Sequence, residues 1–479
     1  MGTHFQLALA VACLCSTVEV NGLVDPQATQ ETQELYDKIV NLTNRNAVAF
    51  GNQYSMFRGI YRNGSGWTNT DSSRPFASDI KNMSGLYPTV CGWDFHEFAE
   101  NANSWRQQNI DAIIRSAELG VINTMSFHMR NPKNQSNYDD TDLDIVDVMP
   151  GGAYHHVFRG YWQAAADAIK LMQMENGSLV PIIIRPYHEL SGNWFWWGTA
   201  NTTPEQFVEL WRWTVEFLRD ENGLHNLLYC YSTDKVYSVD SYLQRWPGDD
   251  YVDIVGIDIY LTDPSPFSQD PHLVLTFPLQ VCIDVAKMKG MPAAFTETGY
   301  PGGMGGTELE NWWTYRILEP LKAKGLLNDI AYVMGWANWG THQWNIPYPG
   351  SSLEPDFVEF LRSPEILLLD DFNPDSVWTW HPGPGWIYTV QFPWVYHMDN
   401  GWWYMPHLFN DFGKKFLDRK PINSFWFYDQ VAGWLWTSDS IYPQLYTPTY
   451  GWMEFISSNG TERLFYRYSE ADYVELPRS

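Results

Sequence analysis

An alternation of short apolar segments with amphipathic segments runs from about Glu34 to Leu361 and constrains the fold more than any other feature. The apolar segments are rich in Val and Ile, as in strands that are buried on both faces of a parallel sheet. Eight of them are expected as strands: Ala47–Phe50, Thr89–Gly92, Val121–Phe127, Val180–Ile184, Asn226–Ser232, Val252–Tyr260, Ala293–Thr296 and Ile330–Trp336. Helical patterns lie between them, for example Trp105–Leu119, Tyr161–Met174, Pro204–Asp220 and Leu309–Lys324. This order predicts an α/β fold of the (β/α)8 TIM-barrel type; a doubly wound sheet is less favoured, because no glycine-rich phosphate turn follows the first strand.

Two glutamates stand where such a barrel presents its chemistry. Glu189 follows the fourth expected strand and Glu297 follows the seventh. The carboxyl ends of all eight strands open at one mouth, and the fourth and seventh strands lie across it, so the two carboxylates can face one another. Retaining glycoside hydrolysis needs this arrangement, with the carboxyl groups roughly 5–5.5 Å apart. The aromatic run from Trp194 to Trp197 suits the same chemistry, because such rings stack on the faces of sugars.

The segment from Arg185 to Gly198 resembles glycoside hydrolase family 26, whose best-known members are secreted endo-β-1,4-mannanases. Similar segments occur along the whole barrel region: Gly51–Gln53, Leu86–Asp94, Ser126–Pro132, Asn226–Ser232, Trp246–Tyr260, Pro347–Gly350 and Asp356–Val358. The resemblance implies a retaining endo-β-1,4-mannanase that cleaves neutral β-mannan of plant or algal origin. A different substrate of the same mechanism, such as β-1,3-xylan or mixed-linkage glucan, stays open, as does a catalytically silent sugar-binding protein.

Carried over residue by residue, the resemblance makes Glu189 the acid/base and Glu297 the nucleophile. Arg185 and Tyr260 are expected to orient Glu297 and keep it ionised. The full set of expected substrate-binding residues is His128, Arg185, His188, Trp194, Trp197, Tyr260 and Trp336. Each assignment has a structural alternative: an ion pair for the charged groups, and a hydrogen-bonded core position for the histidines. The two aromatic residues between Trp194 and Trp197 are expected to pack rather than to touch a ligand.

Composition narrows the partners. The chain of 479 residues has 56 acidic and 30 basic side chains, a formal charge of −26. Such a surface repels nucleic acid and anionic lipid and suits a neutral polysaccharide. No metal and no cofactor are expected, because His188-Glu189 lacks the second histidine of a zinc-protease motif and His155-His156 are not at a helix-face spacing. A monomer without a membrane-spanning segment is expected.

The N-terminal segment predicts secretion. The apolar run Leu7–Cys15 indicates a signal peptide over residues 1–22, although no basic residue precedes the run. Cys91, Cys230 and Cys282 would then remain, and an odd number on core segments predicts buried free thiols.

The pattern changes after the barrel region. We expect the barrel over residues 23–363, a linker over 364–376 and a tryptophan-rich β module over 377–479, in which the segment from Gly385 to Tyr404 resembles that from Gly433 to Trp452. Its indoles could form a carbohydrate-binding face or the core of a structural module, and repeated Gly-Trp at strand starts favours packing. They are Trp378, Trp380, Trp386, Trp394, Trp402, Trp403, Trp426, Trp434, Trp436 and Trp452.

Overall fold

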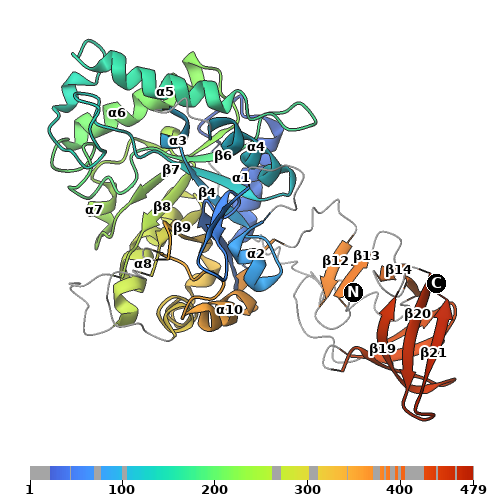
Figure 1. Ribbon diagram of the computed structural model, residues 1–479. Coiled ribbons are helices and arrows are strands. Elements are labelled where there is room, and N and C mark those ends of the chain that lie inside the picture. Colours follow the sequence, from blue (N-terminus) through green and yellow to red (C-terminus); the bar gives the residue numbers. More distant parts are fainter. Residues whose placement is uncertain are drawn as a thin grey trace, which may run out of the picture.

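Eight parallel strands form a closed barrel in the computed structural model (Figure 1). Neighbouring strands pair in chain order, and the last pairs with the first to close the ring. The strands are β1 (Val48–Gln53), β4 (Val90–Asp94), β5 (Ile122–Ser126), β6 (Ile182–Arg185), β7 (Leu227–Thr233), β8 (Ile254–Asp258), β9 (Ala293–Thr298) and β10 (Ile330–Gly335). All eight overlap the expected strands, so the predicted barrel is confirmed.

The structure describes residues 22–43, 45–69, 77–99, 105–261, 271–300, 311–341, 344–369, 378–381, 385–388, 394–397, 401–404, 425–438, 441–458 and 461–477. The expected signal segment falls outside this set apart from Gly22 and stays a prediction. Among the described residues no helix has both the length and the apolar character required to cross a bilayer. Cys91, Cys230 and Cys282 are buried free thiols, as predicted.

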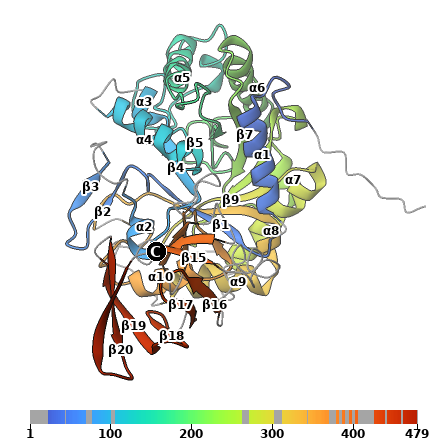
Figure 2. The ribbon, with the colours of Figure 1, turned by 90° about the vertical axis from the view of Figure 1, so that its right-hand side faces the viewer.

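Helices surround the strands, as Figure 2 shows from a second side. The α-helices are α1 (Gln30–Leu42), α2 (Asp79–Ser84), α3 (His96–Ala99), α4 (Arg106–Glu118), α5 (His155–Ile169), α6 (Pro204–Glu216), α7 (Val239–Leu243), α8 (Pro271–Lys289), α9 (Glu319–Ala323) and α10 (Glu354–Arg362). Two π-helical segments, η2 (Phe217–Glu221) and η4 (Trp312–Leu318), extend α6 and precede α9. Short 3-10 turns are η1 (Ile145–Asp147), η3 (Asp249–Tyr251) and η5 (Leu326–Asn328), and a hairpin joins β2 (Arg58–Ile60) to β3 (Gly66–Thr68).

Local sequence explains the sharp start of α6. Thr203 accepts a hydrogen bond from the Gln206 backbone, and the Gln206 side chain accepts one from the Thr203 backbone, which forms a capping box. Pro204 occupies the first helical position, where a missing N–H has no consequence. The helix therefore begins at a fixed distance after the loop that carries Glu189.

The packed barrel layer continues past α10. Strand β11 (Ile366–Leu367) pairs in parallel with β1, and Leu369 bridges Tyr87. These residues lie within the stretch 364–376 that the sequence suggested as a linker, and the residues described there, through Leu369, pair with the barrel.

The C-terminal region forms a second sheet, which Figure 1 shows apart from the barrel. Ten antiparallel strands follow one another in chain order: β12 (Trp378–His381), β13 (Gly385–Tyr388), β14 (Trp394–His397), β15 (Gly401–Tyr404), β16 (Phe425–Asp429), β17 (Gly433–Thr437), β18 (Gln444–Thr447), β19 (Gly451–Ser458), β20 (Glu462–Arg467) and β21 (Asp472–Pro477). The core of this sheet is built from Trp403, Phe427, Ala432, Leu435, Leu445, Met453, Phe465 and Leu476.

Candidate active site

Glu189 is held by an unusual backbone just after β6. Tyr187 and Glu189 both adopt the left-handed region, with φ of 53° and 54°, which is uncommon for residues with a side chain. The ring of Tyr187 is anchored by its hydroxyl, which lies 2.7 Å from the Thr214 hydroxyl and accepts from the Trp162 indole at 3.1 Å. The Glu189 amide donates to the Ser232 carbonyl at 3.0 Å. The fold thus over-determines a strained turn that aims Glu189 into the barrel mouth.

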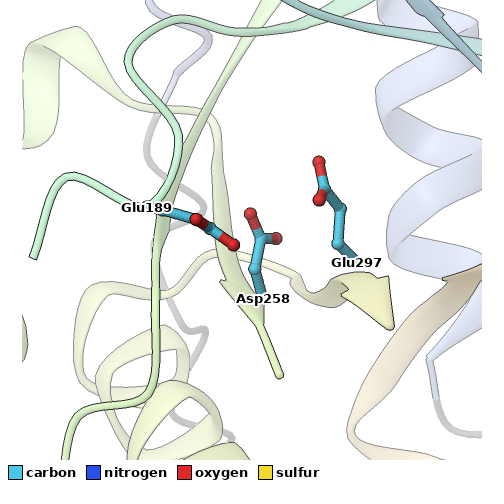
Figure 3. A group of neighbouring side chains, drawn as sticks. All are labelled: Glu189, Asp258 and Glu297. Atoms are coloured by element: carbon cyan, nitrogen blue, oxygen red, sulfur yellow. The ribbon is translucent and has the colours of Figure 1, made fainter. Parts of the chain in front are cut away.

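Glu297 reaches the same place from inside β9, which continues through Thr298, two residues further than expected. Its carboxylate is buried and accepts from the Arg185 guanidinium and, at 3.1 Å, from the Tyr260 hydroxyl. Asp258, at the end of β8, is the third carboxylate of the group (Figure 3). One oxygen of each of the three carboxylates lies within 4.8 Å of the others. The separation of the two glutamates fits retaining hydrolysis rather than the wider spacing of inverting enzymes.

Arg185 supplies the positive charge of this group. Its Nη1 donates to the two Asp258 oxygens at 3.0 and 3.1 Å, and its Nη2 donates to Glu297. Arg185 is itself fully buried, so it acts on a ligand only through these carboxylates. The three carboxylates also lie close enough together to be candidate ligands for a metal ion. Because the guanidinium already neutralises two of them, the arrangement does not require a metal.

Glu189 and Glu297 have different surroundings, which favour the protonated form of the first and the ionised form of the second. Burial raises the pKa of Glu189 well above its usual value, and the charges of Asp258 and Glu297 add to this effect. Burial and Asp258 also raise the pKa of Glu297, to about 7, but Arg185 opposes them. Among the described residues no cation contacts Glu189. The proton therefore favours Glu189, and the charge favours Glu297.

Two histidines, His128 and His188, form a chain of contacts that starts at Asp94, the last residue of β4. Nδ1 of His128 lies 2.5 Å from Asp94 Oδ2, and Nε2 of His128 lies 3.2 Å from Nε2 of His188. Burial alone would raise the pKa of Asp94, but His128 outweighs it and lowers the pKa below its usual range. Burial and His128 lower the pKa of His188 well below its usual value. The chain of contacts therefore presents a neutral His188 beside Glu189.

A cavity of about 600 Å³ opens over these groups. It is lined by Tyr54, Asp94, His96, Glu97, His128, Tyr138, His188, Glu189, Phe195, Tyr260, Glu297, Trp336 and Trp339. The ring of Trp336 lies 5.4 Å from that of His128 and is part of the cavity wall. At one end the Arg58 guanidinium lies 4.0 Å from the Tyr54 ring centre and 4.5 Å from that of Trp339. The cavity thus combines carboxylates, imidazoles and indoles, which suits a neutral sugar.

The aromatic residues from Trp194 to Trp197 differ in whether they reach the cavity. Trp197 is completely buried, its indole donates to the His188 carbonyl at 3.0 Å, and its ring stacks on Phe195. The expectation that Trp197 is a sugar platform is therefore corrected, because neither ring face reaches the cavity. Phe195, expected to pack only, lines the cavity instead. Trp196 is completely buried, and Trp194 is 39% exposed with its indole donating to Glu189.

The sequence reasoning gave no site role to seven residues of the cavity wall or the carboxylate group: Asp258, Asp94, Tyr138, Tyr54, His96, Glu97 and Trp339. Asp258 and Asp94 both end barrel strands, so their positions at the mouth were a usable signal. Asp258 also stands two residues before Tyr260, at the strand period that puts both side chains on one face. Tyr138 lies within the loop between β5 and η1, which has no regular periodicity, and no pattern pointed to it.

Comparison with known proteins relates this chain to one family of glycoside hydrolases. The model of glycosyl hydrolase family 26 matches residues 24–293. A mannan endo-1,4-β-mannosidase of Bifidobacterium adolescentis is 32% identical over 371 residues, which cover 73% of this chain and 36% of that protein. One of Bacillus subtilis is 28% identical over 301 residues, which cover 59% of this chain and 75% of that protein. The chain thus spans about a third of the bifidobacterial relative.

Solved structures of mannanases are similar to this chain over its barrel region. A modular endo-β-1,4-mannanase from Cellulomonas fimi superimposes with a TM-score of 0.66 at 32% identity, covering 73% of this chain and 78% of that one. The GH26 β-mannanase BoMan26A from Bacteroides ovatus gives a TM-score of 0.62 at 30% identity, covering 72% of this chain and 96% of that one.

Proposed function

The chain belongs to glycosyl hydrolase family 26, and from this premise we propose that it is a retaining endo-β-1,4-mannanase. The single observation that carries the proposal is the convergence of Glu189 and Glu297, in unlike surroundings, on one cavity at the barrel mouth. We infer the substrate, a β-1,4-linked mannan, from the relatives that are named mannan endo-1,4-β-mannosidases.

In the first step Glu189 gives its proton to the glycosidic oxygen while Glu297 attacks the anomeric carbon. The bond to the leaving sugar breaks, and a covalent glycosyl-enzyme forms on Glu297. The raised pKa of Glu189 keeps the proton available near neutral pH. The Tyr260 hydroxyl and the Arg185 guanidinium hold the Glu297 carboxylate in place for the attack.

In the second step Glu189, now a carboxylate, takes a proton from a water molecule. The resulting nucleophile attacks the anomeric carbon, and the sugar–Glu297 bond breaks with release of the carboxylate. Both steps invert the anomeric centre, so the product keeps the β configuration. The neutral His188 and the Asp94-anchored His128 line the cavity beside Glu189 and are placed to hydrogen-bond sugar hydroxyls.

Secretion is part of the same proposal. A mannan is too large to enter a cell, so an enzyme that cleaves it internally acts outside. The apolar run Leu7–Cys15 supports this location, as a signal segment over residues 1–22.

Release of reducing ends from linear β-1,4-mannan tests the function. The wild type should release them, and Glu297→Ala should not, because the glycosyl-enzyme cannot form. Asp79→Asn serves as the matched control, since Asp79 is a buried carboxylate bonded to the Trp67 indole and outside the cavity wall. Turnover of β-1,3-xylan or mixed-linkage glucan without turnover of mannan would overturn the substrate and keep the mechanism.

A further inference from the structure

One face of the C-terminal sheet carries an unusual number of exposed aromatic side chains. Along each strand alternate residues point to opposite faces. In β16 the buried Phe427 alternates with the exposed Trp426, and in β17 the buried Leu435 alternates with the exposed Trp434. The strands β18 and β19 repeat this pattern, with Leu445 and Met453 inside and Tyr446 and Trp452 outside. The indoles are therefore divided between a core and an open face.

The strand register arranges four of the outer rings in one row. Trp426 is opposite Trp436, Trp436 is opposite Tyr446, and Tyr446 is opposite Trp452. This row, Trp426–Trp436–Tyr446–Trp452, crosses β16, β17, β18 and β19, and we call it the aromatic row. Its rings touch edge to face, with centroids 5.5 Å apart for Tyr446 and Trp452 and 5.9 Å apart for Trp436 and Trp452. The contacts fix the ring orientations, and they leave three of the four rings exposed while Trp436 is half-buried.

Exposure shows that the row is not a core. Trp426, Tyr446 and Trp452 keep 40%, 36% and 41% of their surface exposed, whereas Trp403 on the opposite face keeps none. A contiguous exposed apolar surface of this kind marks an interaction site in a soluble protein. The packing role that the repeated Gly-Trp pattern favoured is wrong for Trp434 and Trp452, which directly follow a glycine and are exposed. The outer rings therefore need another explanation.

Charge limits what can lie on this face. Between residues 425 and 477 the sequence has only two basic residues, Arg463 and Arg467. Arg463 is completely buried in an ion pair with Asp429, and Arg467 is paired with Asp472 and Glu470. Nucleic acid and anionic lipid need unpaired cations beside the stacking rings, so neither fits. An uncharged ligand with flat apolar faces and polar edges fits both the rings and the acidic surroundings.

We propose that the aromatic row binds a β-1,4-mannan chain that lies across β16 to β19. Neighbouring strands are about 4.8 Å apart, which is close to the length of one β-1,4-linked hexose, so a chain that crosses the four strands covers the whole aromatic row. The indoles provide stacking faces, and Gln444 and Glu454, which lie opposite each other two residues from the row, offer hydrogen bonds to hydroxyls. The choice of mannan as the occupant rests on the proposed function of the barrel.

Binding of the full-length chain to insoluble linear β-1,4-mannan tests this proposal. The inactive Glu297→Ala protein is used so that the matrix is not digested, and Trp426→Ala with Trp452→Ala is introduced into it. The apparent affinity should fall at least tenfold, whereas Trp452→Phe, which keeps a ring face, should retain most of it. Tyr315→Ala, which removes a ring of the barrel that is 52% exposed, is the matched control and should bind like the parent.

Three results would overturn the proposal. The first is equal affinity of the parent and the double variant, and the second is no binding by the parent. The third is a dimer of the parent that the double variant loses, which would make a second copy of the chain the occupant. Thermal unfolding of each variant checks that the sheet is intact. Turnover of soluble mannohexaose, measured with an intact Glu297, separates a failure of the aromatic row from a failure of the barrel. The row variants should cleave mannohexaose at the wild-type rate. Absence of turnover in all proteins, the wild type included, would count against the proposed function of the barrel and not against binding by the row.

Discussion

Nε1 of Trp194 lies 2.6 Å from Oε2 of Glu189 and donates a hydrogen bond to it. Trp194 was expected as a sugar platform, and the structure adds a second task, because this bond stabilises the ionised form of the acid/base. It opposes the increase in pKa that burial and the neighbouring carboxylates impose on Glu189. Trp194 is thus placed to regulate how readily the proton is given up and taken back.

Replacing Trp194 by Phe should move the alkaline limb of the kcat/KM profile to higher pH. Loss of a hydrogen bond to the carboxylate removes an influence that lowers the pKa of Glu189, so the pKa increases further. The pH profile on soluble mannohexaose measures this shift. Trp246→Phe is the matched control, since the Trp246 indole donates to Asp249 at 2.7 Å outside the cavity wall. A limb that moves to lower pH, or an equal shift in both variants, would contradict the assignment.

Replacing Asp258 by Asn should lower kcat by about 10²-fold, because Arg185 loses the partner that fixes it and Glu297 is misplaced. The charge of Asp258 raises the pKa of Glu297, so its removal should also move the acidic limb of kcat/KM to lower pH. Asp253→Asn removes another buried carboxylate whose pKa is raised to about 7, before β8 rather than at its end. That control should leave the acidic limb in place; an unmoved limb in Asp258→Asn would refute the coupling.

Glu189→Ala should have effects that depend on the leaving group. On mannan the loss should be about 10²–10⁴-fold, the contribution typical of a general acid. On an aryl β-mannoside with a highly activated leaving group, formation of the glycosyl-enzyme should be nearly unaffected, because that oxygen needs no proton. Pre-steady-state release of the phenol measures the first step. Equal losses on both substrates would argue against Glu189 as the acid.

Glu189→Gln should stabilise the fold at neutral and alkaline pH. The folded pKa of Glu189 is raised, so its ionisation opposes folding once the pH exceeds the unfolded value of about 4.3. Gln stays neutral and can still accept from Trp194. Its melting temperature should exceed that of the wild type at pH 8, and the difference should vanish near pH 4. The exposed Glu209→Gln on α6 should show no such trend, and a gain in Glu189→Gln that is equal at both pH values would exclude the linkage.

Much of the barrel was predictable because its strands are apolar on both faces, and a continuous run such as Ile182–Ile184 has few alternatives. Helix boundaries were less certain. The helix α5 begins at His155 rather than Tyr161, and a contact with the preceding loop, from His155 Nδ1 to the Val148 carbonyl at 2.8 Å, fixes its first turn. Such a contact leaves no mark in the local sequence.

The site, like the fold, was predictable in part. Glu189 and Glu297 were recognisable from their positions after strands, whereas the orientation of each ring between Trp194 and Trp197 was not. Because Tyr187 and Glu189 are left-handed, the loop follows neither strand nor helix periodicity, and burial of Trp197 could not be inferred from spacing. The role of Asp258 depends on Arg185, 73 residues away, which only the fold brings together.

The anomeric configuration of the first product tests the central claim most directly. Proton NMR should be recorded within the first minutes of mannohexaose hydrolysis, before mutarotation equilibrates the anomers. Two inversions through Glu297 predict that the β-anomer appears first and the α-anomer grows later, with no signal from Glu297→Ala. Initial appearance of the α-anomer, or full activity in Glu297→Ala, would contradict a double displacement by Glu189 and Glu297.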